Sequence, residues 1–308
     1  MGLFRRRPEP QGAPRDPDLP LDVDRAARLR GLVRTTFAEQ GAEVLVAADH
    51  VTDDQGTRFG LWNLAALCAE EPERAWPELV RRHVTHLTAP QPDLADIGQA
   101  ELVASTYFRL IETAGIPHPD WHPGALRFGD VLMAVLSVDR PDTVITPRER
   151  DWDQRGGLER WRATGTANLR ALLASDELSR QRMAHGQQGG DFDVVMGDSF
   201  FTGSLALVAE EVVQRYAPGT DVSRGVLVAA PFRHQLAWRV VDGPDAAVAL
   251  THLFRFAMLG VTDAPGPLSP HVYWVRGGEW RQVTDVSGEQ PAVVVDDDLA
   301  AALGMPPA

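Results

Sequence analysis

The chain has 308 residues, of which 44% are hydrophobic and 24% are charged, and this balance excludes a chain that is disordered throughout. The single cysteine, Cys68, excludes an internal disulfide framework and is typical of a reducing compartment such as the cytoplasm. All 30 basic residues are arginine, which excludes a Walker lysine, a lysine Schiff base and a lysine general base. A high-GC genome accounts for the missing lysines better than selection against lysine-directed tagging, because it also explains the many Ala, Gly, Pro and Val residues.

The net charge of −13 predicts a protein that does not bind nucleic acid, because clustered cations are what hold a phosphate backbone. No apolar run approaches about 20 residues, so we predict no transmembrane helix and no stable membrane insertion. Three arginines, Arg5 to Arg7, open the chain, and each contributes only about 1 kcal/mol at an anionic membrane. A solvated tail is therefore the prediction for this end.

The first half of the chain is predicted to begin with a disordered Pro/Arg-rich arm over residues 1–22, because residues 8–22 contain five prolines. A helix follows, with Asp22 or Asp24 as its N-cap and Gly41 as its end. The segment 102–111 fits either a helix or a strand. The other patterns predict, in chain order, a hairpin of residues 43–47 with 57–61, helices over 62–68 and 76–87, a proline-rich loop over 117–124, and strands over 131–138 and 143–146.

The second half is predicted to alternate helices and strands: a helix over 158–173, a strand over 192–196, a helix through 216 capped by Thr202 or Ser204, strands over 226–230 and 236–241, a helix over 244–259, a hairpin of 272–275 with 280–283, a strand over 293–295 and a last short helix. We therefore predict an α+β fold with mixed helices and short, mainly antiparallel sheets in two subdomains. Their predicted bounds are 23–150 and 151–295, followed by an acidic, short helical tail over 296–308.

Three residues are candidates for catalysis. Ser204 lies where a strand is predicted to give way to a helix, a place where nucleophilic serines are often presented. The glycine spacing of a nucleophile elbow is absent, and a hydroxyl helix cap is the alternative. Arg233 and His234 lie between two predicted strands, where they supply a cation and a titratable imidazole or form a polar hairpin tip. Arg233 can pair with a carboxylate of its own chain or bind a ligand carboxylate.

His118 and His122, with Asp120 between them, are the candidates for a metal site. The neighbouring prolines exclude a helix, so only a loop can bring these side chains together, and a solvated turn is the alternative. Three consecutive carboxylates, Asp296 to Asp298, are predicted to cap the helix that follows them. No glycine-rich dinucleotide fingerprint opens a helix, and we predict no cofactor.

Short motifs spread over most of the chain carry a resemblance to a known family. They are residues 58–64 with 76–84, 138–144, 167–172 and 229–233. In these motifs the chain resembles the uncharacterised bacterial YtpQ-like family, a cytosolic family with no assigned reaction. The resemblance implies a mixed α+β fold and carries over no catalytic residue. Two features depart from the family's pattern. Position 234 is His where the family tends to have Asp, and the segment 184–190 is an insert unfamiliar in the family.

We therefore predict a cytoplasmic, non-catalytic protein-binding or accessory factor with a protein partner. The chain has no complete catalytic, cofactor or metal pattern, and its eight tryptophans are of a type enriched at binding hot spots. The alternative is a hydrolase or transferase with a site between the two subdomains that uses Ser204, Arg233 and His234. That alternative requires the three side chains to converge in one pocket.

Overall fold

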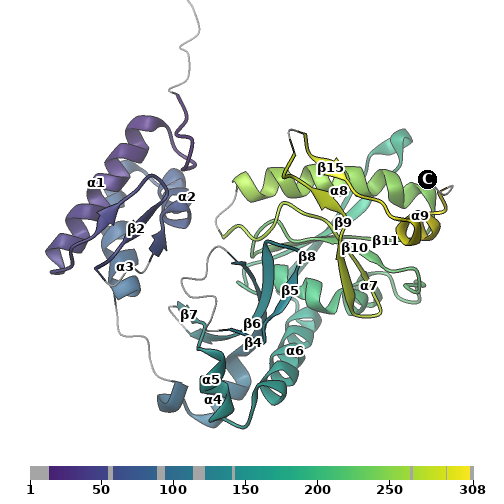
Figure 1. Ribbon diagram of the computed structural model, residues 1–308, viewed down its shortest axis with the longest axis horizontal. Coiled ribbons are helices and arrows are strands. Elements are labelled where there is room, and N and C mark those ends of the chain that lie inside the picture. The colour runs from purple at the N-terminus through teal and green to yellow at the C-terminus, as the bar shows by residue number, and fades with distance from the viewer. Residues whose placement is uncertain are drawn as a thin grey trace, which may run out of the picture. The chain divides into compact units, whose positions relative to one another are not determined.

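The computed structural model describes residues 14–54, 58–88, 94–113, 122–140, 143–263, 266–288 and 290–305. The chain divides into two compact units, Met1–Ala89 and Pro90–Ala308 (Figure 1). Each unit combines helices with antiparallel sheets, which confirms the α+β prediction. Within the described ranges, no helix is both long enough and apolar enough to cross a bilayer.

The first unit packs helices against a three-stranded antiparallel sheet with strand order β1-β2-β3. Its elements are α1 (Val23–Glu39), β1 (Leu45–Val46), β2 (His50–Thr52), β3 (Arg58–Gly60), α2 (Trp62–Glu70), the short 3-10 helix η1 (Glu73–Ala75) and α3 (Trp76–Thr88). The predicted hairpin of residues 43–47 with 57–61 does not form directly, because β2 lies between the two strands.

The core of the first unit is built on helical spacing. Leu29 and Val33 of α1 are buried with Val80 and Val84 of α3, so the two helices share their apolar faces. The Trp76 ring is fully buried, and its Nε1 donates a hydrogen bond to the carbonyl of Cys68 at 2.8 Å. Burial raises the pKa of the Cys68 thiol to about 11.

Residues 14–22 differ from the disordered arm predicted over residues 1–22, of which residues 1–13 lie outside the described ranges. Leu19 and Leu21 are buried in the first unit's core. The Asp16 carboxylate accepts two hydrogen bonds from the Arg30 guanidinium at 2.8 and 2.9 Å, and these bonds hold the pKa of Asp16 below its usual range. Two apolar anchors and a bidentate ion pair order this segment despite its prolines.

The second unit contains the elements from residue 94 onward: η2 (Leu94–Asp96), α4 (Gln99–Ser105), β4 (Thr106–Glu112), β5 (Leu126–Phe128), β6 (Leu132–Arg140), β7 (Thr143–Ile145), α5 (Glu149–Asp153), α6 (Leu158–Ala174), β8 (Leu178–Met183), η5 (Gly186–Gln188), β9 (Phe192–Gly197), η6 (Gly203–Val208), α7 (Ala209–Tyr216), β10 (Val226–Ala229), β11 (Gln235–Val240), α8 (Pro244–Asp263), β12 (Tyr273–Arg276), β13 (Glu279–Gln282), β14 (Thr284–Asp285), β15 (Ala292–Val293) and α9 (Asp297–Leu303).

A six-stranded antiparallel sheet with order β13-β12-β10-β11-β9-β8 is the frame of this unit. Alternate residues of its strands face opposite sides, so Val194 packs with α8 whereas Val195 packs with η6 and α7. Figure 1 shows α8 running along one face of this sheet. The other face shares one continuous core with a smaller sheet of β4, β6, β5 and β7.

Helix α6 docks closely on β4 because Gly165 has no side chain. A Cβ at Gly165 would lie 2.4 Å from the backbone nitrogen of Phe108, which leaves no room for a larger residue. The Asn168 carboxamide donates to the carbonyls of Val103 and Thr106 at 2.8 and 2.6 Å and so fixes the junction of α4 with β4. These contacts tie the segment before residue 150 to the segment after it. The unit boundary at residues 89 and 90 therefore differs from the predicted boundary near residue 150.

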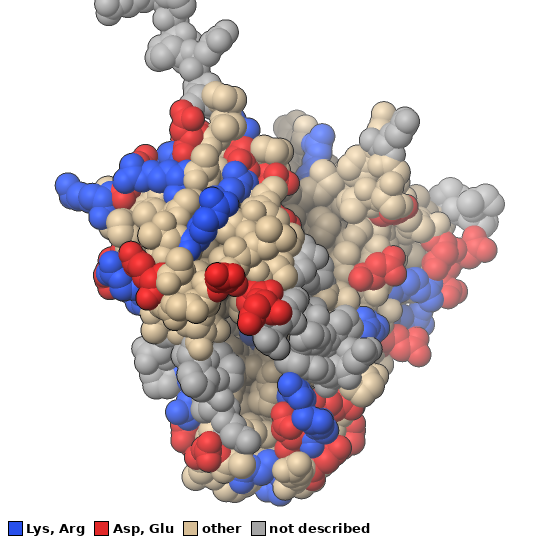
Figure 2. Space-filling model, turned by 60° about the vertical axis from the view of Figure 1, so that its left-hand side comes forward, with Lys and Arg blue, Asp and Glu red and all other residues tan. Residues whose placement is uncertain are grey.

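The tail forms α9 as predicted, and Asp296 is its N-cap, accepting a hydrogen bond from the Leu299 amide at 2.9 Å. Charges of both signs lie interspersed on the face drawn in Figure 2.

Candidate functional site

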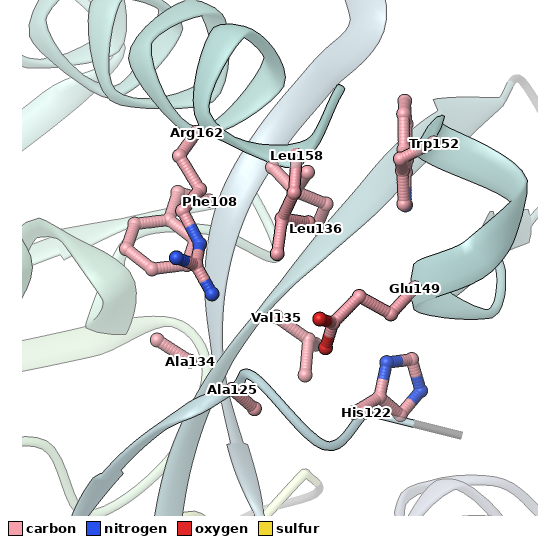
Figure 3. Close-up of a pocket in the computed structure, with 10 residues that line it drawn as sticks. All are labelled: Phe108, His122, Ala125, Ala134, Val135, Leu136, Glu149, Trp152, Leu158 and Arg162. Atoms are coloured by element: carbon pink, nitrogen blue, oxygen red, sulfur yellow. The ribbon is translucent and has the colours of Figure 1, made fainter. Parts of the chain in front are cut away.

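One pocket of the second unit lies beside β6, between α5, α6 and the loop that precedes β5 (Figure 3). Its cavity volume is about 10 Å3, room for about one water molecule and far below the roughly 300–1,000 Å3 of most small-molecule sites. Its walls are formed by Phe108, His122, Ala125, Ala134, Val135, Leu136, Glu149, Trp152, Leu158 and Arg162.

The polar groups of this pocket hold a loop in place. The Glu149 carboxylate accepts a hydrogen bond from the Gly124 amide at 2.7 Å, and Arg162 donates to the Gly124 carbonyl. Burial lowers the pKa of His122, while the carboxylates of Glu149 and Asp151 partly oppose that shift. Glu149 and Arg162 both bond to the backbone of Gly124, so their role in this pocket is to stabilise the loop.

Of the predicted metal candidates, only His122 lies in the described part of the chain. His118 and Asp120 fall outside it. Among the described residues, no group of three or more His, Cys, Asp or Glu side chains is placed to hold a metal ion. The metal site over His118, Asp120 and His122 stays a prediction.

Ser204 lies in η6 and is buried, with 1% of its surface exposed. Its Oγ accepts a hydrogen bond from the backbone N–H of Leu110 in β4 at 2.9 Å. Strand β4 is at the edge of its sheet, so this hydroxyl satisfies a backbone donor that no neighbouring strand reaches. Ser204 therefore links η6 to β4. The predicted side-chain cap by Thr202 or Ser204 is wrong, because η6 has no side-chain cap hydrogen bond and the N-cap of α7 is Val208.

Arg233 and His234 lie in the turn between β10 and β11. The Arg233 guanidinium carbon lies 4.2 Å from the centre of the Phe200 ring, and Nε donates to Nε2 of His234 at 3.0 Å. The other ring nitrogen of His234, Nδ1, lies 3.2 Å from the carbonyl oxygen of Gly197. Together these two bonds place the imidazole proton on Nδ1. Burial, aided by the nearby Arg233 charge, lowers the pKa of His234 and keeps the ring neutral.

The three catalytic candidates come from neighbouring backbone but do not form a proton relay. The Gly203 amide donates to the Arg233 carbonyl at 2.8 Å, which brings η6 beside the turn. The Ser204 hydroxyl is nevertheless bonded to β4, and both nitrogens of His234 are engaged elsewhere. A general base needs a free lone pair within reach of its nucleophile, and this arrangement supplies none.

Arg109 of β4 is a functional candidate that the sequence reasoning missed. Burial, together with the positive charge of Arg233, lowers its pKa to about 10, and the Asp139 carboxylate only partly opposes this. Burial also raises the pKa of Asp139, an effect that Arg109 partly opposes. The signal in the sequence is a lone arginine inside the apolar run of residues 107–111.

The chain matches no family model, no curated protein and no solved structure. The YtpQ-like resemblance stays a prediction.

Proposed function

We propose that the protein is a non-catalytic binding or accessory factor that acts by holding a protein partner. The observation that supports this most directly is the use of both His234 ring nitrogens in hydrogen bonds to Arg233 and Gly197. A histidine held in this way positions an arginine and does not abstract a proton. The bond from the Leu110 amide to Ser204 agrees with this, because the hydroxyl has a structural role.

The surface beside His234 has the composition of a binding site. Phe200 is a large apolar side chain with 37% of its surface exposed, and the Arg233 guanidinium stacks on its ring. Arginine and aromatic residues are enriched at the centres of protein interfaces, where a rigid ring and a planar cation make contact at low entropic cost. We therefore place the partner's contact at Phe200 and Arg233.

Site-specific crosslinking tests the binding proposal. A photo-crosslinking phenylalanine analogue replaces Phe200 in the full chain in its native cells, and Leu126, exposed on β5, carries the same analogue as the matched control. We expect a defined protein to crosslink at position 200 and not at position 126, and the additional substitution Arg233→Met to abolish it. Equal crosslinking at both positions contradicts the proposal.

A second experiment tests the hydrolase or transferase alternative. A fluorophosphonate probe reacts with activated serines, and we expect it to leave Ser204 of the native protein unmodified. The alternative expects labelling of Ser204 that His234→Gln removes. Labelling with that dependence would replace the binding proposal by an acyl-transfer mechanism.

A further inference from the structure

Arg109 and Arg233 are carried by neighbouring elements of the second unit. Tyr107, which shares a face of β4 with Arg109, stacks on Phe201 with ring centres 4.0 Å apart, and the adjoining Phe200 lies under the Arg233 guanidinium. The charge of Arg233 adds to burial in lowering the pKa of Arg109, and the Asp139 carboxylate partly opposes this shift. Among the described residues, neither guanidinium lies within 4.0 Å of a carboxylate oxygen. Like charges withdrawn from water destabilise the folded state unless something compensates them.

The Nε atom of Arg109 is an unmet hydrogen-bond donor. It is enclosed by the protein and has no hydrogen-bond partner in the described part of the chain. An enclosed donor without a partner destabilises the folded state, and more so when the group is charged. Native proteins retain such donors where a ligand, ion or water completes them.

Arg233 is held in one orientation by its surroundings. A Cβ at Gly266 would lie 2.6 Å from the Arg233 Cδ, and Gly266 has a φ of +77°, so only glycine leaves room for this stem. Phe200 supports the face of the guanidinium, and His234 accepts the bond from its Nε. The terminal nitrogens have no hydrogen-bond acceptor among the described residues. A cation fixed in this way is preorganised for a ligand.

We propose that Arg109 and Arg233 form a binding site for one oxyanion, a carboxylate or a phosphate group. A guanidinium binds both groups through two parallel N–H donors, and a second cation compensates the remaining charge. We expect a single anionic group and not a polyanion, because the net charge of −13 on the chain repels a ligand that carries many negative charges. This inference goes beyond the proposed function, because it names the chemical group that is bound.

Anion titration of the full chain tests the site. The unfolding midpoint is measured against inorganic phosphate, malonate and an oligoglutamate peptide, with sodium chloride at equal ionic strength as the reference. We expect a saturable rise for at least one of these oxyanions and none for chloride. Arg109→Met and Arg233→Met each weaken the apparent affinity about tenfold or more, as loss of a charge-assisted hydrogen bond requires. Arg276→Met, an exposed arginine that also lies over an aromatic ring, leaves the affinity unchanged.

The arms of this titration separate two sources of the anion. Tighter binding of the peptide than of phosphate assigns the site to a carboxylate of a protein partner, and the reverse assigns it to a small free anion. A shift of the Arg109 Nε–Hε nuclear magnetic resonance signal on titration is a second readout that does not depend on variant stability. The proposal is overturned if no oxyanion gives a saturable response, or if both Met variants respond like the native chain.

Discussion

Two arginine pairs in the second unit differ in whether a carboxylate compensates them. On β8, Arg180 and Arg182 surround the buried Asp193 of β9, whose carboxylate accepts hydrogen bonds at 2.9 and 3.1 Å. Arg109 and Arg233 also lie close together, but the described structure places no carboxylate in contact with either.

The difference separates a structural role from a binding role. Asp193 needs its arginines, because a buried carboxylate without a cation is strongly destabilising. The other pair has no carboxylate in contact with it, and Asp139 only partly offsets the charge of Arg109, so we expect these charges to lower stability until an anion binds. The same residue type therefore strengthens the fold in one place and weakens it in the other.

The largest effect is expected at the compensated pair. Arg180→Met with Arg182→Met leaves Asp193 buried without a cation, and we expect a loss of roughly 3 kcal/mol in the free energy of unfolding. Urea denaturation measures this loss, with Arg276→Met as the control for removing an exposed arginine. A loss below about 1 kcal/mol would show that the compensation has little structural value.

A smaller loss is expected from Ser204→Ala, because it leaves the buried Leu110 amide without an acceptor. We expect about 1–3 kcal/mol in urea denaturation. Ser179→Ala, on the exposed β8 strand, should cost only a few tenths of a kcal/mol. Unchanged anion affinity in Ser204→Ala would show that this hydroxyl supports the sheet and does not belong to the oxyanion site.

The histidine that holds Arg233 should also make stability depend on pH. The folded pKa of His234 is lowered below its ordinary value of 6.5, mainly by burial. The unfolded chain then binds the proton more readily, so stability is full above that value and falls as the pH drops toward the folded pKa. His234→Gln should flatten part of this fall in pH-dependent urea denaturation. Part of the loss of stability at low pH should remain in this variant, because the pKa values of His122 and His271 are also lowered. An identical acid slope in the variant would contradict this role.

The smallest effect, and the one of opposite sign, is expected from Arg109→Met. In buffer without oxyanions, the variant should match the native stability or exceed it by about 1 kcal/mol, because a buried and repelled charge is removed. Urea denaturation in a chloride buffer measures it. A loss of more than about 2 kcal/mol would mean that the arginine is compensated in the folded chain.

Local patterns predicted much of the fold where the partner elements were near in sequence. The helix predicted over 158–173 is α6, and the hairpin of 272–275 with 280–283 matches β12 and β13. The segment 102–111 could not be assigned because its periodicity fits both states. Pairing with β6 makes a strand from Thr106 onward and leaves α4 before it.

The candidate site was less predictable, because its properties arise between distant segments. Arg233 and His234 were identified from their turn, yet their bond to one another and the nearby Arg109 depend on how β4 lies beside η6. The role of Ser204 depends on β4 being an edge strand, which no local pattern shows.

The buried Cys68 has a practical consequence for spectroscopy. Its thiol has a pKa of about 11 and is enclosed in the first unit's core, so it resists alkylation near neutral pH. A cysteine introduced on the surface, for example by Leu126→Cys, would be the only reactive thiol in the chain. Fluorescent or spin labels can therefore be attached at a chosen position without removing the native cysteine.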